Sequence, residues 1–239
     1  MGADLGAGWV TADRLVCPLH GLGFFPDGSC DRPGVGAARR LAAAEAGGAV
    51  FVHPSPSTGM RVPAPWRADL RFGRRLHTEH VPIPWQVMIA NAFDLHHLRA
   101  VHRRELAEDV VFDRPDPDHL RMTYVTRVVG RGMSDRIMAR LSGDRVRVSL
   151  TCAGGPTLVV EVELPRTRTA AVVGMVPDAL GTTVRIAVGV APGIGGALRA
   201  RIARWLYVTF LRRDLPVLQR VAFSPWSDLP EDRPVQELA

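Results

Sequence analysis

The segment NAFDLHHLRAVH, residues 91–102, holds the densest group of potential metal ligands in the chain. It contains three of the eight histidines, together with Asp94 and the sequence's only asparagine, Asn91. The surrounding residues favour helix formation and include no glycine, which predicts one helix through the segment. At about 100° per residue, His97 and His102 then lie on either side of Asp94 on one helix face. Two imidazoles on one face can hold a transition metal, but they need further ligands.

A third ligand is expected from a distant part of the chain, because a 2-His-1-carboxylate set binds ferrous iron and leaves positions open for dioxygen. Asp214 is the candidate, since it lies beside Pro216, where a kink could turn it inward. Asp228 and Glu231 are weaker alternatives, and taken alone Asp214 also fits a solvated acid beside two arginines. Zinc is a rival metal, yet the sequence has neither His-Glu-x-x-His nor Cys-x-x-Cys.

The rest of the C-terminal region predicts an α+β domain. Short stretches that alternate apolar and polar residues between turn signals indicate an antiparallel sheet. These stretches are residues 120–129, 145–152, 157–163, 169–175 and 182–191. The chain then ends in a long helical pattern with Leu198, Ile202, Trp205 and Leu206 on one stripe, which Pro216 should kink or end. A sheet flanked by two helices is the expected architecture.

A second potential metal site lies near the N-terminus. Cys17 and His20 form a Cys-x-x-His unit on a glycine-rich turn between short apolar runs. Residues 1–58 read as a small β-rich domain whose core is thin, which suits a unit held together by a metal cluster. Proline-rich sequence then marks a boundary, and we place a linker at 59–80 and the larger domain at 81–239.

The composition of the chain argues against membrane, secreted and nucleic-acid-binding proteins. No apolar run among the 239 residues is long enough for a membrane helix, no signal peptide is visible, and three cysteines form no disulfide framework. We therefore expect a soluble, cytoplasmic protein that does not bind membranes. The net charge is +6, all of the basic Lys and Arg positions are arginines, and these are scattered among acidic residues. A role in binding nucleic acid is therefore disfavoured.

Taken together, the two units resemble the Rieske non-haem iron oxygenases, the family of aromatic-ring-hydroxylating oxygenase alpha subunits. Residues 2–30 look like the second half of a Rieske [2Fe–2S] domain, whose ligands come as Cys-x-His and Cys-x-x-His. Residues 91–102 resemble the mononuclear iron motif Asn-x-x-Asp-x-x-His-x-x-x-x-His, and RRDLPVLQR, residues 212–220, is similar to the family's C-terminal Asp segment. The resemblance covers nearly the whole chain in the family's order.

The resemblance implies a role for each candidate residue. Cys17 would bind one iron of the [2Fe–2S] cluster and His20 the other. The catalytic Fe(II) would be held by His97, His102 and Asp214. Asp94 would connect a cluster histidine of one subunit to an iron ligand of the next, and Asn91 and Asp94 would tune the iron. The implied fold is a truncated small β Rieske domain followed by a helix-grip (START-like) catalytic domain with an antiparallel sheet and a long C-terminal helix.

The resemblance also implies an activity. The chain would be a terminal oxygenase that uses O₂ to oxidise a small apolar substrate, aromatic or alicyclic and steroid-like. A ferredoxin or flavin reductase would supply electrons, and the family's rings imply a homotrimer. Hydroxylation, dihydroxylation, demethylation and desaturation all remain open. The alternative is a non-catalytic helix-grip protein that binds an apolar ligand and carries a decayed cluster domain.

The sequence departs from the family in one respect. The first Cys-x-His pair would stand directly before Gly2, where the sequence has only Met1. The resemblance therefore predicts a start site assigned too late or an N-terminally truncated gene. As written, the chain would hold an incomplete cluster site and would be inactive for that reason.

Overall fold

The computed structural model describes residues 3–46, 49–52, 69–73, 75–117, 119–143, 145–153 and 155–221. The chain divides into two compact units, Met1–Glu45 with Val50–Val62 and Ala46–Ala49 with Pro63–Ala239. The fold is α+β, with a small β unit followed by a helix-grip domain of antiparallel sheet and long C-terminal helix, as predicted. None of the helices in the described part of the chain has the length and apolar character needed to cross a membrane.

The small unit consists of very short strands, which reflects its frequent glycines and prolines. Its elements are η1 (Leu5–Ala7), β1 (Trp9–Val10), β2 (Leu15–Val16), β3 (Gly23–Phe24), β4 (Ala43–Ala46) and β5 (Ala49–Val52). Strands β1, β2 and β3 form an antiparallel sheet, and β4 pairs with β5. These short strands agree with the β-rich character that the sequence predicts for this part of the chain.

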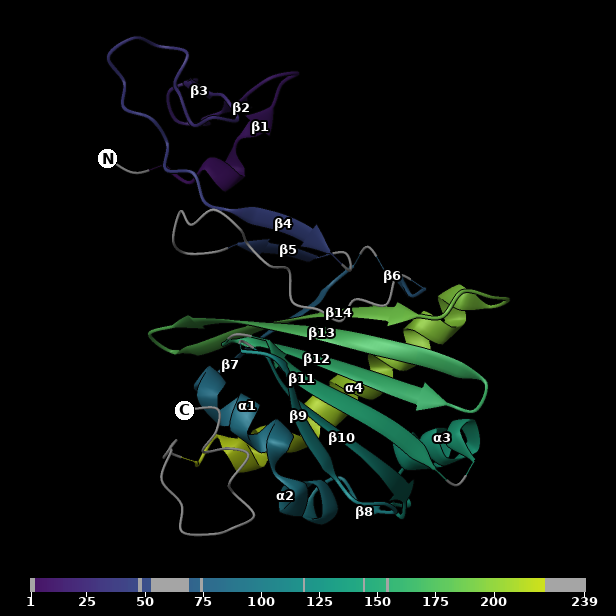
Figure 1. Ribbon diagram of the computed structural model, residues 1–239. Helices are drawn as coiled ribbons and strands as arrows, with labels where there is room; N and C mark the ends of the chain where they lie inside the picture. Colours follow the sequence, from purple (N-terminus) through teal and green to yellow (C-terminus); the bar gives the residue numbers. More distant parts are fainter. Residues whose placement is uncertain are drawn as a thin grey trace. The chain divides into compact units, whose positions relative to one another are not determined.

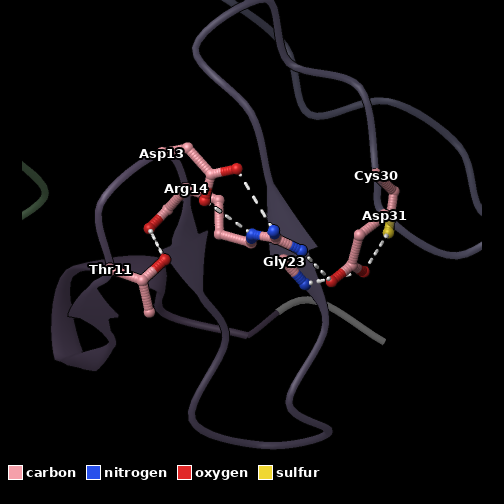
Figure 2. A network of polar contacts seen from close by, with 6 residues as sticks. All are labelled: Thr11, Asp13, Arg14, Gly23, Cys30 and Asp31. Atoms are coloured by element: carbon pink, nitrogen blue, oxygen red, sulfur yellow. Dashed lines mark hydrogen bonds and ion pairs between the residues drawn. The ribbon is translucent and has the colours of Figure 1, made fainter.

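Polar contacts hold the small unit together (Figure 2). The Asp31 carboxylate accepts hydrogen bonds from the Gly23 backbone N–H at 3.0 Å, from the Arg14 guanidinium at 3.3 Å and from the Cys30 thiol at 3.7 Å. The Gly23 N–H, and after it Arg14, hold the pKa of Asp31 below its ordinary value. Arg14 also pairs with Asp13 at 2.9 Å. This network ties β2, β3 and the following loop together, where few apolar side chains are buried.

The large unit is built on a nine-stranded antiparallel sheet. Its order is β6-β14-β13-β12-β11-β10-β8, with β7 also on β14 and β9 also on β10. The strands are β6 (Arg71–Phe72), β7 (His77–Val81), β8 (Arg104–Leu106), β9 (Val111–Asp116), β10 (His119–Val128), β11 (Val146–Ala153), β12 (Thr157–Leu164), β13 (Thr167–Asp178) and β14 (Gly181–Val190). Strands β6 and β7, which lie almost entirely within the linker expected at 59–80, pair with β14 of the sheet.

Helices lie on one face of this sheet and close the core (Figure 1). They are α1 (Trp85–Phe93), α2 (Leu95–Ala100), α3 (Met133–Ser142) and α4 (Gly196–Leu218). The core between helices and sheet includes Ile83, Phe93, Met122 and Ile186, each at most 2% exposed. Because α4 packs along β14 and β7, its inner face and the concave face of the sheet enclose the interior of the unit.

The structure corrects three expectations about the helices. The single helix expected across residues 91–102 is broken at Asp94, which ends α1 and begins α2. The last helix includes Pro216 and ends at Leu218, so the proline does not end the helix, and a kink at Pro216 stays a prediction. Of the expected stripe, Ile202 and Leu206 line the cavity on the inner face of α4, whereas Leu198 is 62% and Trp205 39% exposed. Helix α3 had no counterpart in the prediction.

Candidate metal centre

Three potential metal ligands from distant parts of the chain meet inside the large unit. Asp214 Oδ1 lies 2.8 Å from His97 Nε2 and 2.7 Å from His102 Nε2. The three donor atoms lie within 4.8 Å of one another. The side chains are 8%, 2% and 9% exposed for His97, His102 and Asp214. The structure thus brings together the three residues that the sequence analysis proposed as ligands of a mononuclear metal.

The break at Asp94 explains how two nearby histidines converge. Asp94 has an extended backbone, with φ −84° and ψ 107°, and its Oδ1 accepts a hydrogen bond of 2.9 Å from the His97 backbone N–H. Aspartate is a strong helix N-cap because its carboxylate replaces a missing helical acceptor. The cap starts the six-residue α2, which carries His97, and His102 follows in the turn after it. Convergence therefore comes from a capped short helix and a turn, not from one helix face.

Ring packing fixes the orientation of His102. Its imidazole stacks on Phe210 of α4, with ring centroids 3.4 Å apart and planes 4° apart. The His97 ring stands edge-on to it, at 5.1 Å and 70°. His102 Nδ1 is buried and has no hydrogen-bond partner in the described part of the chain. Phe210, one helical turn before Asp214, was not identified from the sequence, although its i−4 spacing places it on the same face of α4.

Burial and hydrogen bonding set the charges at the centre. Burial alone would raise the pKa of Asp214, but hydrogen bonds from His102 and His97 outweigh it, and the pKa lies below its ordinary value. Burial lowers the pKa of His102 against the opposing attraction of Asp214. An ionised carboxylate and a neutral imidazole are the forms that bind metals. The donor set of two imidazoles and one carboxylate is the one that ferrous iron takes in oxygenases, so these residues fit Fe(II).

The centre opens into an apolar cavity of about 260 Å³. Its walls come from the sheet, from α1 to α3, and from the inner face of α4. Leucine, valine, isoleucine and methionine make up half of the lining residues, including Met88, Leu150, Val160 and Ile202. Asn91 and Asp94, both singled out from the sequence, line the cavity beside the three ligands. An apolar cavity with few polar groups is typical of a site for a small apolar molecule.

A buried ionic cluster flanks the centre and was not identified from the sequence. Asp135 of α3 accepts hydrogen bonds from Arg213 at 3.0 and 3.1 Å and contacts Arg104 at 3.5 Å. Arg213 also donates to the Ser134 hydroxyl at 2.7 Å. Arg213 precedes Asp214, and Arg104 lies two residues after His102, so the cluster connects α3 to both ligand-bearing segments. Only the tertiary structure reveals this pairing, because Asp135 lies far from both arginines in sequence.

The N-terminal Cys-x-x-His unit lies on a closed loop. The Cys17 N–H donates to Leu22 O at 2.8 Å, and the Gly21 N–H donates to Cys17 O at 3.0 Å. Gly21 has a φ of 64°, which glycine adopts without strain. Cys17 is buried, while His20 is exposed on the turn. Across the described residues, the only group of three or more potential ligands is His97, His102 and Asp214, so the small unit presents no complete cluster site there.

Asp228 and Glu231, the weaker alternatives for the third ligand, lie outside the described residues.

Comparisons with known proteins support the fold. No protein-family model matches the sequence, and no curated protein matches it significantly. Among solved structures, NdmA of Pseudomonas putida CBB5 with caffeine has a TM-score of 0.70 at 18% identity, covering 98% of this chain and 73% of NdmA. Dicamba monooxygenase bound to dicamba has a TM-score of 0.67 at 15% identity, covering 99% and 80%. Dicamba monooxygenase with non-heme iron and dicamba gives 0.59 at 14% identity, covering 99% and 80%. At these identities the likeness shows that the chain shares the fold of these proteins.

Proposed function

We propose that this chain is the terminal oxygenase component of a Rieske-type non-haem iron enzyme that oxidises a small apolar substrate with O₂. The observation that carries the proposal is the buried convergence of His97, His102 and Asp214 on an apolar cavity. The fold likeness to dicamba monooxygenase, one structure of which holds non-heme iron, supports it. The order of the motifs along the chain, set out in the sequence analysis, supports it independently.

The residues of the centre and the cavity would have different roles in the reaction. His97, His102 and Asp214 would hold the ferrous ion, which when bound supplies the capacity to activate dioxygen. Phe210 keeps the His102 ring in place, and the Asp94 cap positions His97. The apolar walls exclude water and bind the substrate by burying its apolar surface. Asn91 and Asp94 provide the polar groups beside the reacting position.

The reaction needs electrons from outside the chain. In a monooxygenation, one C–H bond of the substrate becomes C–OH, the second oxygen atom leaves as water, and two electrons and two protons are consumed. In a dihydroxylation both oxygen atoms enter the product, again with two electrons and two protons. A ferredoxin or flavin reductase would supply the electrons, as expected from the family resemblance. A homotrimer and a cytoplasmic location are further parts of this proposal.

The described residues do not provide a complete set of ligands for the [2Fe–2S] cluster of the family. A Rieske cluster takes two cysteines on one iron and two histidines on the other. Cys17 and His20 would supply one ligand to each iron, and the described residues place no second pair beside them. We therefore assign no electron-transfer step to this chain's small unit.

Iron binding tests the proposal directly. The wild-type protein is loaded anaerobically with Fe(II), freed of excess metal, and compared with His97→Ala and with His96→Ala as the matched control. His96 is exposed and adjacent to the ligand. We expect about one mononuclear iron per chain for the wild type and His96→Ala, and at least a tenfold loss of affinity for His97→Ala.

The spectrum of the nitric oxide adduct reports the mononuclear iron separately from any cluster. Equal iron uptake by all three proteins would contradict the assignment of the centre.

A binding protein without catalytic activity is the second candidate, and the apolar cavity is the observation that favours it. It predicts that the wild type binds an apolar fluorophore in the cavity yet takes up no Fe(II). Iron uptake that depends on His97 together with O₂-dependent product formation excludes it.

A further inference from the structure

The cavity extends along α4 well beyond the metal centre. Side chains from Arg199 to Asp214 on one face of the helix line the same cavity. These two residues lie 15 positions apart on α4. At 1.5 Å per residue, their backbone positions are about 22 Å apart along the helix axis. Leu206 and Phe210 lie between them and add apolar surface. The cavity is therefore long, with the metal centre at one end and Arg199 at the other.

The end at Arg199 is polar and incompletely paired. Arg199 Nη2 donates to Ala191 O at 3.1 Å, but its Nε is buried and has no hydrogen-bond partner among the described residues. No carboxylate in the described part of the chain forms an ion pair with this guanidinium. The Thr167 hydroxyl lines the same end of the cavity, and it is likewise buried without a partner.

Two further hydroxyls line the cavity and bond to each other. Thr169 Oγ1 and Tyr207 OH lie 3.0 Å apart, and both line the cavity. Thr167 and Thr169 lie two residues apart on β13, so their side chains face the same side of the sheet. Arg199 and Tyr207 reach this side from α4. Tyr207 lies eight positions after Arg199 and seven before Asp214 on α4, so the Thr169–Tyr207 pair lines the middle of the cavity. Arg199 and Thr167 are the polar groups at the end away from the metal ligands.

Such an arrangement suits an anion. A buried polar group without a partner costs free energy, and water could satisfy the hydroxyl. Water is neutral, so it cannot balance the positive charge of a partly buried guanidinium that has no carboxylate partner. The planar guanidinium also matches a carboxylate in two parallel hydrogen bonds.

We infer that Arg199, with Thr167, binds the carboxylate of an elongated amphipathic substrate whose apolar body lies along α4 toward the metal centre. This inference rests on the proposed function and narrows its substrate class from small apolar molecules to apolar carboxylic acids. The carboxylate lies at the end of the molecule opposite the carbon that is oxidised. Arg199 is then a residue that determines specificity.

A fluorescent carboxylic acid and its ester test the inference on the full chain. The probes are 11-(dansylamino)undecanoic acid and its methyl ester, which share the apolar body and differ in the charge. We expect the wild type to bind the acid at least tenfold more tightly, the range of a charge-assisted hydrogen bond. Arg199→Gln should lose this preference while binding the ester as before, and Thr167→Val should weaken acid binding by a smaller factor.

Arg201→Gln is the matched control, because Arg201 is exposed on the same helix. It should keep the wild-type preference. Equal binding of acid and ester by the wild type, or an unchanged preference in Arg199→Gln, would overturn the inference.

Iron uptake by the wild type separates this inference from the proposed function. Fe(II) binding without acid preference contradicts the carboxylate site and leaves the oxygenase proposal in place. Acid preference without Fe(II) binding contradicts the oxygenase proposal and leaves the carboxylate site in place.

Discussion

Asp135 connects α3 to both segments that carry the candidate metal ligands. It is 4% exposed at its side chain and faces two guanidiniums, those of Arg213 and Arg104. Burial would raise the pKa of Asp135, but hydrogen bonds and attraction from Arg213, with a further contribution from Arg104, bring it below its ordinary value. Since the two arginines flank Asp214 and His102 in sequence, one carboxylate holds both ligand-bearing segments against α3.

Removing this charge should destabilise the protein. Asp135→Asn leaves the buried guanidinium of Arg104 and the partly buried one of Arg213 without a carboxylate, and we expect a loss of about 3 kcal/mol in unfolding free energy at pH 7. Asp113→Asn is the control, because the Arg121–Asp113 pair is 36% and 39% exposed and should contribute about 1 kcal/mol or less. Urea unfolding of the three proteins measures both values.

The pH dependence has a definite sign. Because the pKa of Asp135 is lower in the folded than in the unfolded protein, its stabilisation is present above the unfolded value of about 4. It is lost as the pH falls through the folded value. The gap between wild type and Asp135→Asn should therefore shrink below about pH 4. A gap that stays constant from pH 7 to pH 3 would rule out ionised Asp135 as its source.

Residue-level prediction from the sequence succeeded where the chemistry was local. His97 and His102 stand close together with Asp94, so the motif alone singles them out. Asp214 could be favoured as a ligand only through the family resemblance, because a single acid beside two arginines does not by itself indicate a metal site. Phe210 and Asp135 could not be found, since stacking on His102 and pairing with distant arginines are consequences of the tertiary structure.

At the level of elements, Asp94 has a structural role that the motif does not reveal. Its carboxylate caps α2 by accepting the His97 N–H at 2.9 Å, and its extended backbone ends α1. An aspartate inside a helical pattern competes with the backbone for hydrogen bonds, which is why one expected helix became two. The position of the His97 ring therefore depends on the cap.

Substitutions at Asp94 separate capping from charge. Asp94→Ala removes the cap and should cost about 1 kcal/mol of unfolding free energy and about tenfold in Fe(II) affinity. Asp94→Asn keeps a cap of similar strength, so its unfolding free energy and Fe(II) affinity should be close to those of the wild type. Urea unfolding and anaerobic Fe(II) titration provide the two readouts. If Asp94→Asn matched Asp94→Ala in both, the negative charge and not the cap would be what the centre requires.

The sheet was predictable because its strands alternate. Residues 145–152 and 182–191 were expected as strands and form most of β11 and β14. Helix α3 escaped prediction because it is short and polar, and its start depends on the Asp135 carboxylate accepting the Gly132 N–H at 3.1 Å. The short β6 and β7 carry no clear pattern of their own and are defined by pairing with β14.

At the level of the whole molecule, the two units are stabilised by different means. The large unit buries a continuous apolar core between helices and sheet. The small unit relies on the Asp31 network, in which Gly23 is packed closely (Figure 2). A Cβ at Gly23 would lie 2.5 Å from both Arg14 Cδ and Asp31 Oδ2. A side chain there cannot fit without displacing the network.

Gly23→Ala should therefore destabilise the small unit alone. We expect faster amide hydrogen exchange across residues 15–31, with Fe(II) uptake by the large unit unchanged. Gly36→Ala is the control, because a Cβ there meets no atom within 4 Å. Equal exchange in both variants would show that the network does not hold the small unit together, and a loss of Fe(II) uptake would show that the two units depend on each other.

The separation of His97 from Asp214 by 117 positions has a consequence for biosynthesis. Both histidines leave the ribosome long before the carboxylate does, and a pair of imidazoles alone binds metal weakly. A nascent chain cannot complete its coordination set until α4 has been synthesised and has docked. Under the proposed function, tight metal binding would wait until α4 has docked, so a tightly held ion would mark a chain in which α4 is in place.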